Sequence, residues 1–248
     1  MDDKKLLILN KAEEIIECCN KNGVNARLMG GTAIYIKCPS AEKDPFKREI
    51  NDIDIVIYHN EGRKLKNAIS ESGFMPDKQF NSIHGETRML FKNGDIDLDV
   101  FVGKFIQCHE LNLEENMKSE TDTIPLSDLL LTKLQVVQIN LKDIKDILLM
   151  LTDHEFSEKQ ESGFIDINRI LKVVGRDWGW YTTISDNLQK IKSMLPDIFK
   201  DDEKGKDDVS IKIDELKKRM AEEKKTLQWK LRSKIGRKVK WYELPEEK

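Results

Sequence analysis

Acidic residues alternate with isoleucines in one short stretch of the chain, Asp52-Ile53-Asp54-Ile55. If this stretch is a strand, both carboxylates point to one face, about 6–7 Å apart, while the isoleucines face the core. Two like charges side by side repel each other unless a cation or a proton lies between them. A hard divalent cation with oxygen ligands would supply the opposite charge. The alternative is an amphipathic edge strand whose acidic face is solvated.

A second stretch repeats the pattern, Asp95-Ile96-Asp97-Leu98-Asp99. Its three acids would share one face of a strand and its apolar residues the other. If both strands lie in one sheet with their acidic faces aligned, two or three carboxylates can hold two Mg²⁺ ions roughly 4 Å apart. Two acidic strands favour this metal site more than either strand does alone.

Gly30-Gly31-Thr32 lies between an expected strand and an expected helix. Glycine lets a phosphate approach the backbone closely, and the start of a helix offers free N–H donors to an anion. Tight turns also use paired glycines, so the pair alone indicates little.

Hydrophobic periodicity predicts the elements that position these residues. In the first half we expect helices and strands to mix: helices at 3–21, 32–37 and 61–72, and strands at 24–29, 53–58, 87–91 and 95–102. The dipeptide Asn93-Gly94 predicts a two-residue hairpin turn with positive φ at both positions. Beyond Pro125 we expect helices alone, at 126–140, 141–151, 166–174 and 178–194.

This order predicts an α+β protein with a mixed sheet and a helical C-terminal region. We expect a core domain at 1–125, a helical region packing on that core at 126–200, and a charged linker with a basic segment at 201–248.

The composition is that of a soluble protein. The chain has 248 residues, of which 39% are hydrophobic and 35% charged. No apolar run approaches the roughly 18 residues of a membrane span, and the N-terminus lacks the basic start and long apolar region of a signal peptide. Four cysteines without CxxC spacing indicate neither a zinc site nor disulfides. We therefore expect a cytoplasmic protein that does not contact membranes.

Charge is unevenly distributed along the chain. Residues 217–240 hold eleven lysines and arginines against two glutamates, a segment charge of +9, so the remainder of this −3 chain carries −12. The stretch 201–208 before it, DDEKGKDD, is expected to be a solvated linker or helix-joining loop. A basic segment can bind nucleic acid. Apolar residues among the charges, including Trp229 and Trp241, equally favour packing on the protein itself.

The motifs LMGGTAI (28–34) and REINDIDI (48–55) resemble those of the DNA polymerase β-like nucleotidyltransferase superfamily. The pattern there is a hydrophobic-Gly-Gly element, then Asp-x-Asp, then a single later acid on a neighbouring strand. The closest resemblance is to proteins related to the AbiEii toxins, over FNSIHGETR (80–88), LLLTKLQ (129–135) and KDIKDIL (142–148). The gap between Gly31 and Asp52 is longer than is usual in the superfamily.

The resemblance implies a polymerase β-like nucleotidyltransferase fold and assigns roles to three acids. Asp52 and Asp54 would bind two Mg²⁺ ions, and Asp99 would join the metal to the attacking hydroxyl, with Asp97 as the alternative third acid. An NTP would be the substrate, and Gly30, Gly31 and Thr32 would lie at its phosphates.

Three basic residues are candidate phosphate ligands. Arg48 and Arg88 carry guanidinium forks that suit phosphate oxygens, although both could also be surface residues. Lys133 is the one charged residue between Leu129 and Leu141. The resemblance implies that Lys133 reaches the triphosphate, supported by Asp143 or Asp146; alternatively Lys133 snorkels and the two acids are solvated. His84 is a candidate for proton transfer, although a lone histidine is more often structural.

Several acceptors for the nucleotidyl group remain open. The basic segment favours RNA, in particular tRNA by resemblance to the toxins, followed by a protein side-chain hydroxyl and then a small molecule. The same resemblance implies a cognate antitoxin as a partner. The competing hypothesis is a nucleotide-binding or protein-interaction module of the same fold that has lost catalysis.

Overall fold

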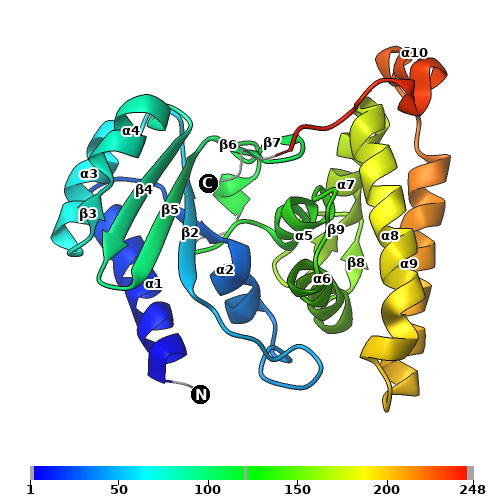
Figure 1. The fold of residues 1–248 in the computed structure, drawn as a ribbon, viewed down its shortest axis with the longest axis horizontal. Helices are drawn as coiled ribbons and strands as arrows, with labels where there is room; N and C mark the ends of the chain where they lie inside the picture. The colour runs from blue at the N-terminus through cyan, green and yellow to red at the C-terminus, as the bar shows by residue number, and fades with distance from the viewer. Residues whose placement is uncertain (1–2, 120–121, 245–248) are drawn as a thin grey trace. The chain divides into compact units, whose positions relative to one another are not determined.

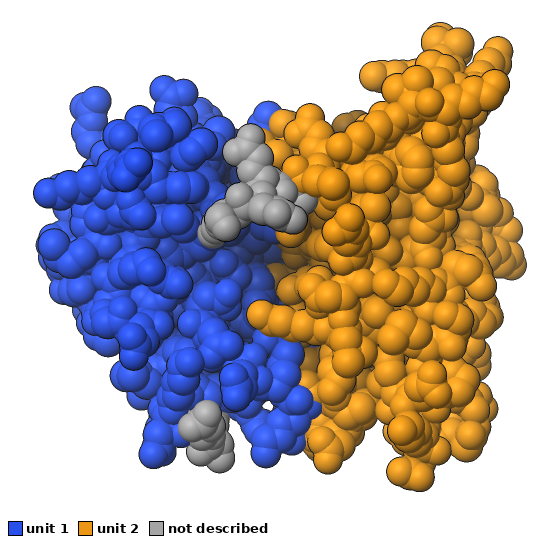
Figure 2. All heavy atoms as spheres, viewed as in Figure 1, with its two compact units in different colours: residues 1–42, 47–105, 111–125 blue, residues 43–46, 106–110, 126–248 orange. Residues whose placement is uncertain are grey.

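The computed structural model describes residues 3–119 and 122–244, which form two compact units. Unit 1 comprises residues 1–42, 47–105 and 111–125, and unit 2 comprises residues 43–46, 106–110 and 126–248 (Figure 2). The grouping follows contacts rather than chain order, so two short stretches of the N-terminal half belong to unit 2.

Unit 1 is an α/β unit whose centre is a five-stranded sheet (Figure 1). Its elements in chain order are α1 (Asp3–Lys21), β1 (Arg27–Met29), α2 (Gly30–Lys37), β2 (Asp52–Ile57), α3 (Gly62–Glu71), β3 (Met75–Pro76), α4 (Lys78–His84), β4 (Arg88–Asn93) and β5 (Ile96–Val102). The order across the sheet is β1-β2-β5-β4-β3. Only β2 and β5 run parallel among these neighbours, and the other pairs are antiparallel, so the sheet is mixed as predicted.

Alternation of residue types gives the sheet its buried face. Ile53, Ile55 and Leu98 have no exposed surface, while the acids between them lie on the other face. Helices α1 and α3 pack against each other, and α1 also packs against β2. The apolar residues of both strands therefore form a core, and the acids are excluded from it.

The hairpin between β4 and β5 uses a different turn from the one predicted. Asn93 pairs with Ile96, so the two turn residues are Gly94 and Asp95. Gly94 has φ +57°, and no non-glycine residue in the described part of the chain has a positive φ. Glycine at the first turn position is typical of a type II′ turn, which needs positive φ there alone. The prediction of positive φ at Asn93 is therefore wrong, and Asp95 lies in the turn rather than in the strand.

Unit 2 is mainly helical. Its principal elements are α5 (Leu126–Leu134), α6 (Leu141–Asp153), β8 (Phe156–Ser157), β9 (Ile165–Asp166), α7 (Ile167–Arg176), α8 (Trp178–Ile198), α9 (Glu203–Glu222), α10 (Leu227–Ile235) and the 3₁₀ turn η2 (Gly236–Lys238). The long helix α8 packs against α5, α7, α9 and α10 (Figure 1). The remaining elements are β6 (Lys104–Ile106) and β7 (Glu110–Asn112), which pair in a two-stranded sheet, and the turn η1 (Met117–Ser119).

Beyond Pro125 the expectation of helices alone is wrong, because β8 and β9 form a short parallel pair, and several helix boundaries also differ from the sequence prediction. The stretch 201–208, expected to be a linker, instead contains the start of α9, because Asp202 caps the helix by accepting a hydrogen bond from the Gly205 N–H (2.9 Å). Val209 and Ile213 then bury the apolar stripe of that helix. The helix expected at 126–140 ends at Leu134, and Asn140 caps a new helix by accepting from the Asp143 N–H (3.0 Å).

No helix in the described ranges 3–119 and 122–244 is both long enough and apolar enough to cross a membrane. The four cysteines are free thiols, as predicted, and three of them are buried.

Candidate active site

The parallel pairing of β2 and β5 brings the acidic faces together. Asp54 is the register partner of Asp99, and Asp52 is the partner of Asp97. Register partners on neighbouring strands point to the same face of a sheet, about 5 Å apart between strands. All four carboxylates therefore share one face of unit 1, the arrangement that the two acidic stretches predicted.

Asp97 and Asp99 differ in their surroundings. The Asp97 carboxylate is exposed and forms a surface ion pair with Lys92 (3.2 Å). The Asp99 side chain is 14% exposed and accepts hydrogen bonds from Arg88, whose Nε lies 2.8 Å and 3.0 Å from the two carboxylate oxygens and whose Nη2 also donates to Oδ2. Of the two carboxylates, Asp99 is the one that is shielded from water and fixed in direction.

Arg88 is held in place by aromatic rings as well as by Asp99. Its guanidinium lies 5.8 Å from the centroid of the Phe80 ring and 5.3 Å from that of Phe101. The hydrogen bonds that Arg88 donates to Asp99 raise the pKa of Arg88 above its usual value. Sequence reasoning proposed Arg88 as a phosphate ligand and Phe80 as a packing residue, and it missed that Arg88 binds Asp99 and that Phe80 packs on Arg88. The only sequence signal for this contact was the alternation of residues in β4, which places Arg88 on the same face of the sheet as Asp99 when β4 pairs with β5.

The two glycines at the start of α2 make room for two charged side chains. Gly30 has φ +63°, and a Cβ atom added there would overlap Oδ2 of Asp54. A Cβ at Gly31 would lie 2.6 Å from Nη2 of Arg48. Asp54 and Arg48 thus pack directly on the backbone of the Gly-Gly turn. A side chain at Gly30 would displace Asp54 and strain the backbone, whereas one at Gly31 would require the end of the Arg48 side chain to move.

The helix after this turn begins earlier than expected, at Gly30 rather than near Thr32. The residue at its N-cap position, Met29, makes no side-chain cap hydrogen bond. The Thr32 hydroxyl instead donates to the main-chain oxygen of Asp52 (3.0 Å), which ties α2 to β2. The Arg48 Nη1 donates to the main-chain oxygen of Glu49 (2.8 Å).

Lys133 lies in unit 2, in a compact cluster of charges. Its Nζ is 3.0 Å from Asp143 Oδ1 and 3.0 Å from Asp146 Oδ2. Burial alone would lower the pKa of Lys133, but the two carboxylates outweigh it and raise that pKa. The acids are buried rather than solvated, since Asp146 is 2% exposed. Sequence reasoning missed a second buried pair, Arg169 with Asp128 (2.8 Å), for which the only signal was an acid within an apolar run.

Two other features of unit 1 lie apart from the acids. A cavity of about 720 Å³ is lined by Met89 and Val102, which alternate with the acid-face residues and so point to the opposite face of the sheet. His84 is exposed at the end of α4, and its ring packs on Phe80 (4.6 Å between centroids) rather than on an acid.

The donor set suits a hard divalent cation, because Asp52, Asp54 and Asp99 supply carboxylate oxygens on one face. Within the described ranges, however, no three His, Cys, Asp or Glu side chains converge closely enough to hold a metal ion. Arg88 provides a physical reason, since its guanidinium donates to both oxygens of Asp99. The three residues therefore suit a metal ion in their ligand type and in sharing one face of the sheet, while the Asp99 carboxylate is already paired with Arg88.

A family model described as an uncharacterised nucleotidyltransferase matches residues 1–193. The chain belongs to this family. The match confirms the superfamily and the fold class that the motifs predicted, an α+β nucleotidyltransferase fold with a helical C-terminal region. No curated protein shows significant sequence similarity to the chain.

Solved structures of other nucleotidyltransferases are distantly similar. The solution structure of the antibiotic-resistance factor ANT(2″)-Ia is 12% identical, covers 58% of this chain and 83% of its own, and has a TM-score of 0.41. An antigenic nucleotidyltransferase-like protein from Paracoccidioides brasiliensis is 16% identical over 78% of this chain and 90% of its own, with a TM-score of 0.43. A tRNA-processing enzyme is 15% identical over 90% of this chain and 59% of its own, with a TM-score of 0.33.

Proposed function

We propose that this nucleotidyltransferase family member transfers an NMP from an NTP to an acceptor hydroxyl, and that Asp52, Asp54 and Asp99 are its catalytic, metal-binding carboxylates. The observation that carries the proposal is the register of Asp54 with Asp99 on parallel neighbouring strands, beside the Gly30-Gly31 turn. Acids on one face next to a helix start combine ligands for a cation with N–H donors for phosphate.

In this reaction the acceptor oxygen attacks the α-phosphorus, the bond from that phosphorus to the bridging oxygen breaks, and pyrophosphate leaves. Bound Mg²⁺, two ions by resemblance, would neutralise the triphosphate and lower the pKa of the acceptor hydroxyl. The chain's own contribution is positioning. Gly30 and Gly31 would let phosphate approach the main chain at the start of α2, Arg48 beside Gly31 supplies positive charge, and Arg88 fixes the direction of Asp99.

Isothermal titration of each NTP with and without Mg²⁺ tests the site. We expect Mg²⁺-dependent binding that Asp54→Asn and Asp99→Asn weaken strongly. The matched control is Asp97→Asn, because Asp97 lies on the same strand face but pairs only with exposed Lys92. Undiminished binding by Asp54→Asn, or a larger loss for Asp97→Asn than for Asp99→Asn, would contradict the assignment.

For the acceptor we propose RNA, with tRNA the specific class by resemblance. Support comes from the +9 charge of residues 217–240, because clustered lysines and arginines gain free energy by displacing counterions from a polyphosphate. The charge of −12 on the remainder of the chain opposes RNA near the acids. A protein side chain and a small molecule are the next candidates.

A labelling experiment separates these acceptors. The purified chain is incubated with each α-labelled NTP and Mg²⁺ in a cell extract, and aliquots are treated with RNase or with protease. Label in RNA is expected to disappear with RNase alone. Label that survives RNase and is lost to protease would replace RNA by a protein acceptor.

The competing function is an inactive nucleotide-binding or protein-interaction module, favoured by the bidentate hold of Arg88 on Asp99. This module would bind an NTP, and Asp99→Asn would leave binding unchanged. A toxin role with a cognate antitoxin rests on the AbiEii resemblance. We expect induction of the wild-type chain, but not of Asp54→Asn, to arrest growth of a bacterial host.

A further inference from the structure

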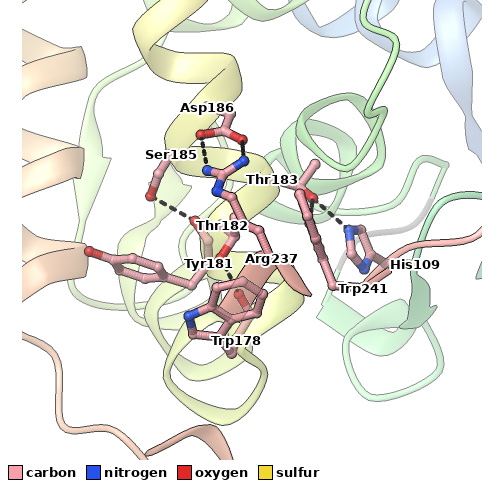
Figure 3. Close-up of polar contacts among 9 residues, drawn as sticks. All are labelled: His109, Trp178, Tyr181, Thr182, Thr183, Ser185, Asp186, Arg237 and Trp241. Carbon is pink, nitrogen blue, oxygen red and sulfur yellow. Dashed lines mark hydrogen bonds and ion pairs between the residues drawn. The ribbon is translucent and has the colours of Figure 1, made fainter. Parts of the chain in front are cut away.

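The end of the chain folds onto helix α8 within unit 2. Here "C-terminal segment" means residues 224–244. Arg237 donates to both carboxylate oxygens of Asp186 (2.7 Å and 2.8 Å), and the Trp241 indole N–H donates to the Thr183 hydroxyl (3.1 Å). Figure 3 shows Arg237 reaching Asp186 on α8, with Trp241 beside Thr183. The segment lies beyond residues 1–193 that the family model matches.

The arginines of this segment hold its fold together. Arg232 donates to the main-chain oxygens of Gly236 (2.7 Å) and Val239 (2.8 Å), and its guanidinium lies 4.8 Å from the centroid of the Trp178 ring. Together with the ion pair between Arg237 and Asp186, these contacts hold α10 and η2 against α8. The arginine charges are therefore engaged within the protein.

The lysines of the segment are arranged differently. Lys230, Lys234 and Lys238 are exposed and succeed one another at four-residue intervals along α10 and η2. In the described part of the chain none of the three forms an ion pair with a carboxylate. Within α10 that interval advances about 6 Å. Lys230 and Lys234 therefore repel each other on one face of α10, and a bound polyanion would relieve that repulsion.

A pocket of about 370 Å³ lies on the face of α10 that carries Trp229 and Arg232, away from Lys230 and Lys234, and is lined by three indoles, those of Trp178, Trp229 and Trp241. Arg176 and Arg232 also line it. Its one acid is Asp177, whose Oδ1 accepts from the Trp180 N–H. Aromatic faces next to guanidinium groups are the surfaces on which unpaired nucleobases stack.

Trp229 adds a second, independent feature to this pocket. Its indole N–H is buried, and within the described residues that N–H has no hydrogen-bond partner. Because this N–H is shielded, a ligand in the pocket reaches it only when the surrounding side chains move. A nucleobase would then offer carbonyl and ring-nitrogen acceptors, whereas a purely apolar ligand would not.

We propose that the C-terminal segment is a binding site for single-stranded RNA. The strand passes around α10, so that backbone phosphates contact Lys230, Lys234 and Lys238 on one face and an unpaired base enters the pocket of Trp178, Trp229 and Trp241 on the other. This inference rests on the proposed function, because it names where the RNA acceptor of that reaction is held. The pocket requires a single strand, since duplex bases are stacked on one another and cannot enter.

Intrinsic fluorescence reports directly on this site. All four tryptophans of the chain lie in unit 2, and the fourth, Trp180, is next to Trp178 on α8. The full chain is titrated with a single-stranded RNA dodecamer of mixed sequence, in EDTA and without NTP. We expect saturable quenching of tryptophan fluorescence and an affinity that falls steeply with salt. The same dodecamer annealed to its complement is expected to quench weakly.

The test variant is Lys230→Glu/Lys234→Glu/Lys238→Glu, which changes only exposed side chains. We expect its RNA affinity to fall at least about tenfold, with a shallower salt dependence because fewer phosphates are neutralised. The matched control is Lys64→Glu/Lys66→Glu/Lys78→Glu, which makes the same charge change on exposed residues of α3 and α4. That control is expected to bind nearly as the wild type does.

Trp229→Phe tests the pocket separately, because it keeps a ring and removes the N–H. We expect weaker quenching and a loss of affinity of a few-fold, with circular dichroism unchanged. Equal losses in the two lysine variants, binding without a fluorescence change, or equal quenching by the duplex or by a polyglutamate peptide would overturn the inference.

The result is separable from the proposed function. Asp54→Asn is expected to bind RNA as the wild type does, because the assay contains neither NTP nor metal. RNA binding without nucleotidyl transfer would contradict the proposed function but support this binding site. Transfer to RNA that the lysine variant leaves unchanged would support the proposed function and contradict this binding site.

Discussion

At the scale of single residues, the candidate site depends on side chains that pack against glycine. Asp54 lies where a side chain on Gly30 would be, and Arg48 lies where one on Gly31 would be. A Gly-Gly turn is common in proteins. In this one, charged side chains occupy the space beside both glycines, so the turn brings the start of α2 into contact with the acidic strand.

Gly30→Ala is expected to abolish Mg²⁺-dependent NTP binding, because the new methyl group must displace Asp54. It also strains the backbone, since φ at Gly30 is +63°, at a cost of about 1–2 kcal/mol. Gly23→Ala is the matched control, with φ +66° and open space around the added Cβ. Urea unfolding and calorimetry measure both properties. Equal loss of NTP binding in the two variants would attribute the effect to backbone strain alone.

Arg88 and Asp99 are expected to be energetically coupled. Arg88→Met leaves a largely buried carboxylate without its partner, so we expect it to cost on the order of 1–3 kcal/mol of unfolding free energy. In Arg88→Met/Asp99→Asn that charge is gone, and the double variant should lose less than the sum of the two single variants. Additive losses in a double-mutant cycle of urea unfolding would mean that the pair makes no net contribution.

At the scale of elements, the register between β2 and β5 makes one site out of two separate acidic stretches. Alternation alone predicted that each stretch has an acidic face, and the apolar partners Ile53 and Leu98 confirm it by their complete burial. Alternation could not tell that the strands are parallel neighbours, because that depends on long-range pairing. The choice between Asp97 and Asp99 depends on Lys92 and Arg88, which come from a third strand.

Helix ends show the same limit of local reasoning. The start of α9 at Glu203 was hidden in a charged stretch, because the apolar stripe that stabilises it begins only at Val209. For Lys133 the resemblance named Asp143 or Asp146 as the supporting acid, and both contact its Nζ from the next helix, α6, while its contact with phosphate stays a prediction. The sequence carried the types of these residues but not the contacts that define their surroundings.

Lys133→Met tests the structural role of that lysine. The substitution leaves Asp143 and Asp146 buried with two uncompensated charges, so we expect a loss of about 3–5 kcal/mol in unfolding free energy. Adding Asp146→Asn should restore part of it. The control is Lys142→Met, at an exposed position of α6, the helix that carries the two acids. Unchanged stability combined with weaker NTP binding would instead support a phosphate-binding Lys133.

His109 gives unit 2 a specific pH dependence. Its side chain accepts or donates a hydrogen bond at Thr183 (2.9 Å), and burial lowers its pKa from 6.5 to about 4, against a smaller opposing effect of Asp177. The unfolded chain therefore takes up this proton first as the pH falls. The contribution of neutral His109 is fully present above pH 6.5 and is lost between pH 6.5 and about 4.

We expect this loss to amount to on the order of 1–3 kcal/mol. Unfolding free energies measured in urea across this range should fall less steeply for His109→Gln than for the wild type. The exposed His84→Gln should follow the wild type. Parallel curves for His109→Gln and wild type would show that this histidine titrates as it does in the unfolded chain.

At the scale of the whole molecule, charge and chemistry are divided between the two units. Unit 1 carries the candidate catalytic acids and the Gly-Gly turn. Unit 2 carries the lysines of the C-terminal segment and all four tryptophans. A nucleotidyltransferase with a polyanionic acceptor needs both, because the acids that hold a cation would repel the acceptor on their own. Binding of the acceptor and transfer to it are therefore expected to be separable by variants in different units.

Transfer of the α-phosphoryl group tests the central claim most directly. Purified chain is incubated with Mg²⁺, total RNA and each NTP labelled either at the α- or at the γ-phosphate. We predict that label enters the acceptor from the α-position only, with one pyrophosphate released per label. Asp54→Asn should incorporate none, whereas Asp97→Asn should resemble the wild type. Incorporation from the γ-position, or from neither position with RNA, protein and small-molecule acceptors all supplied, would contradict the account.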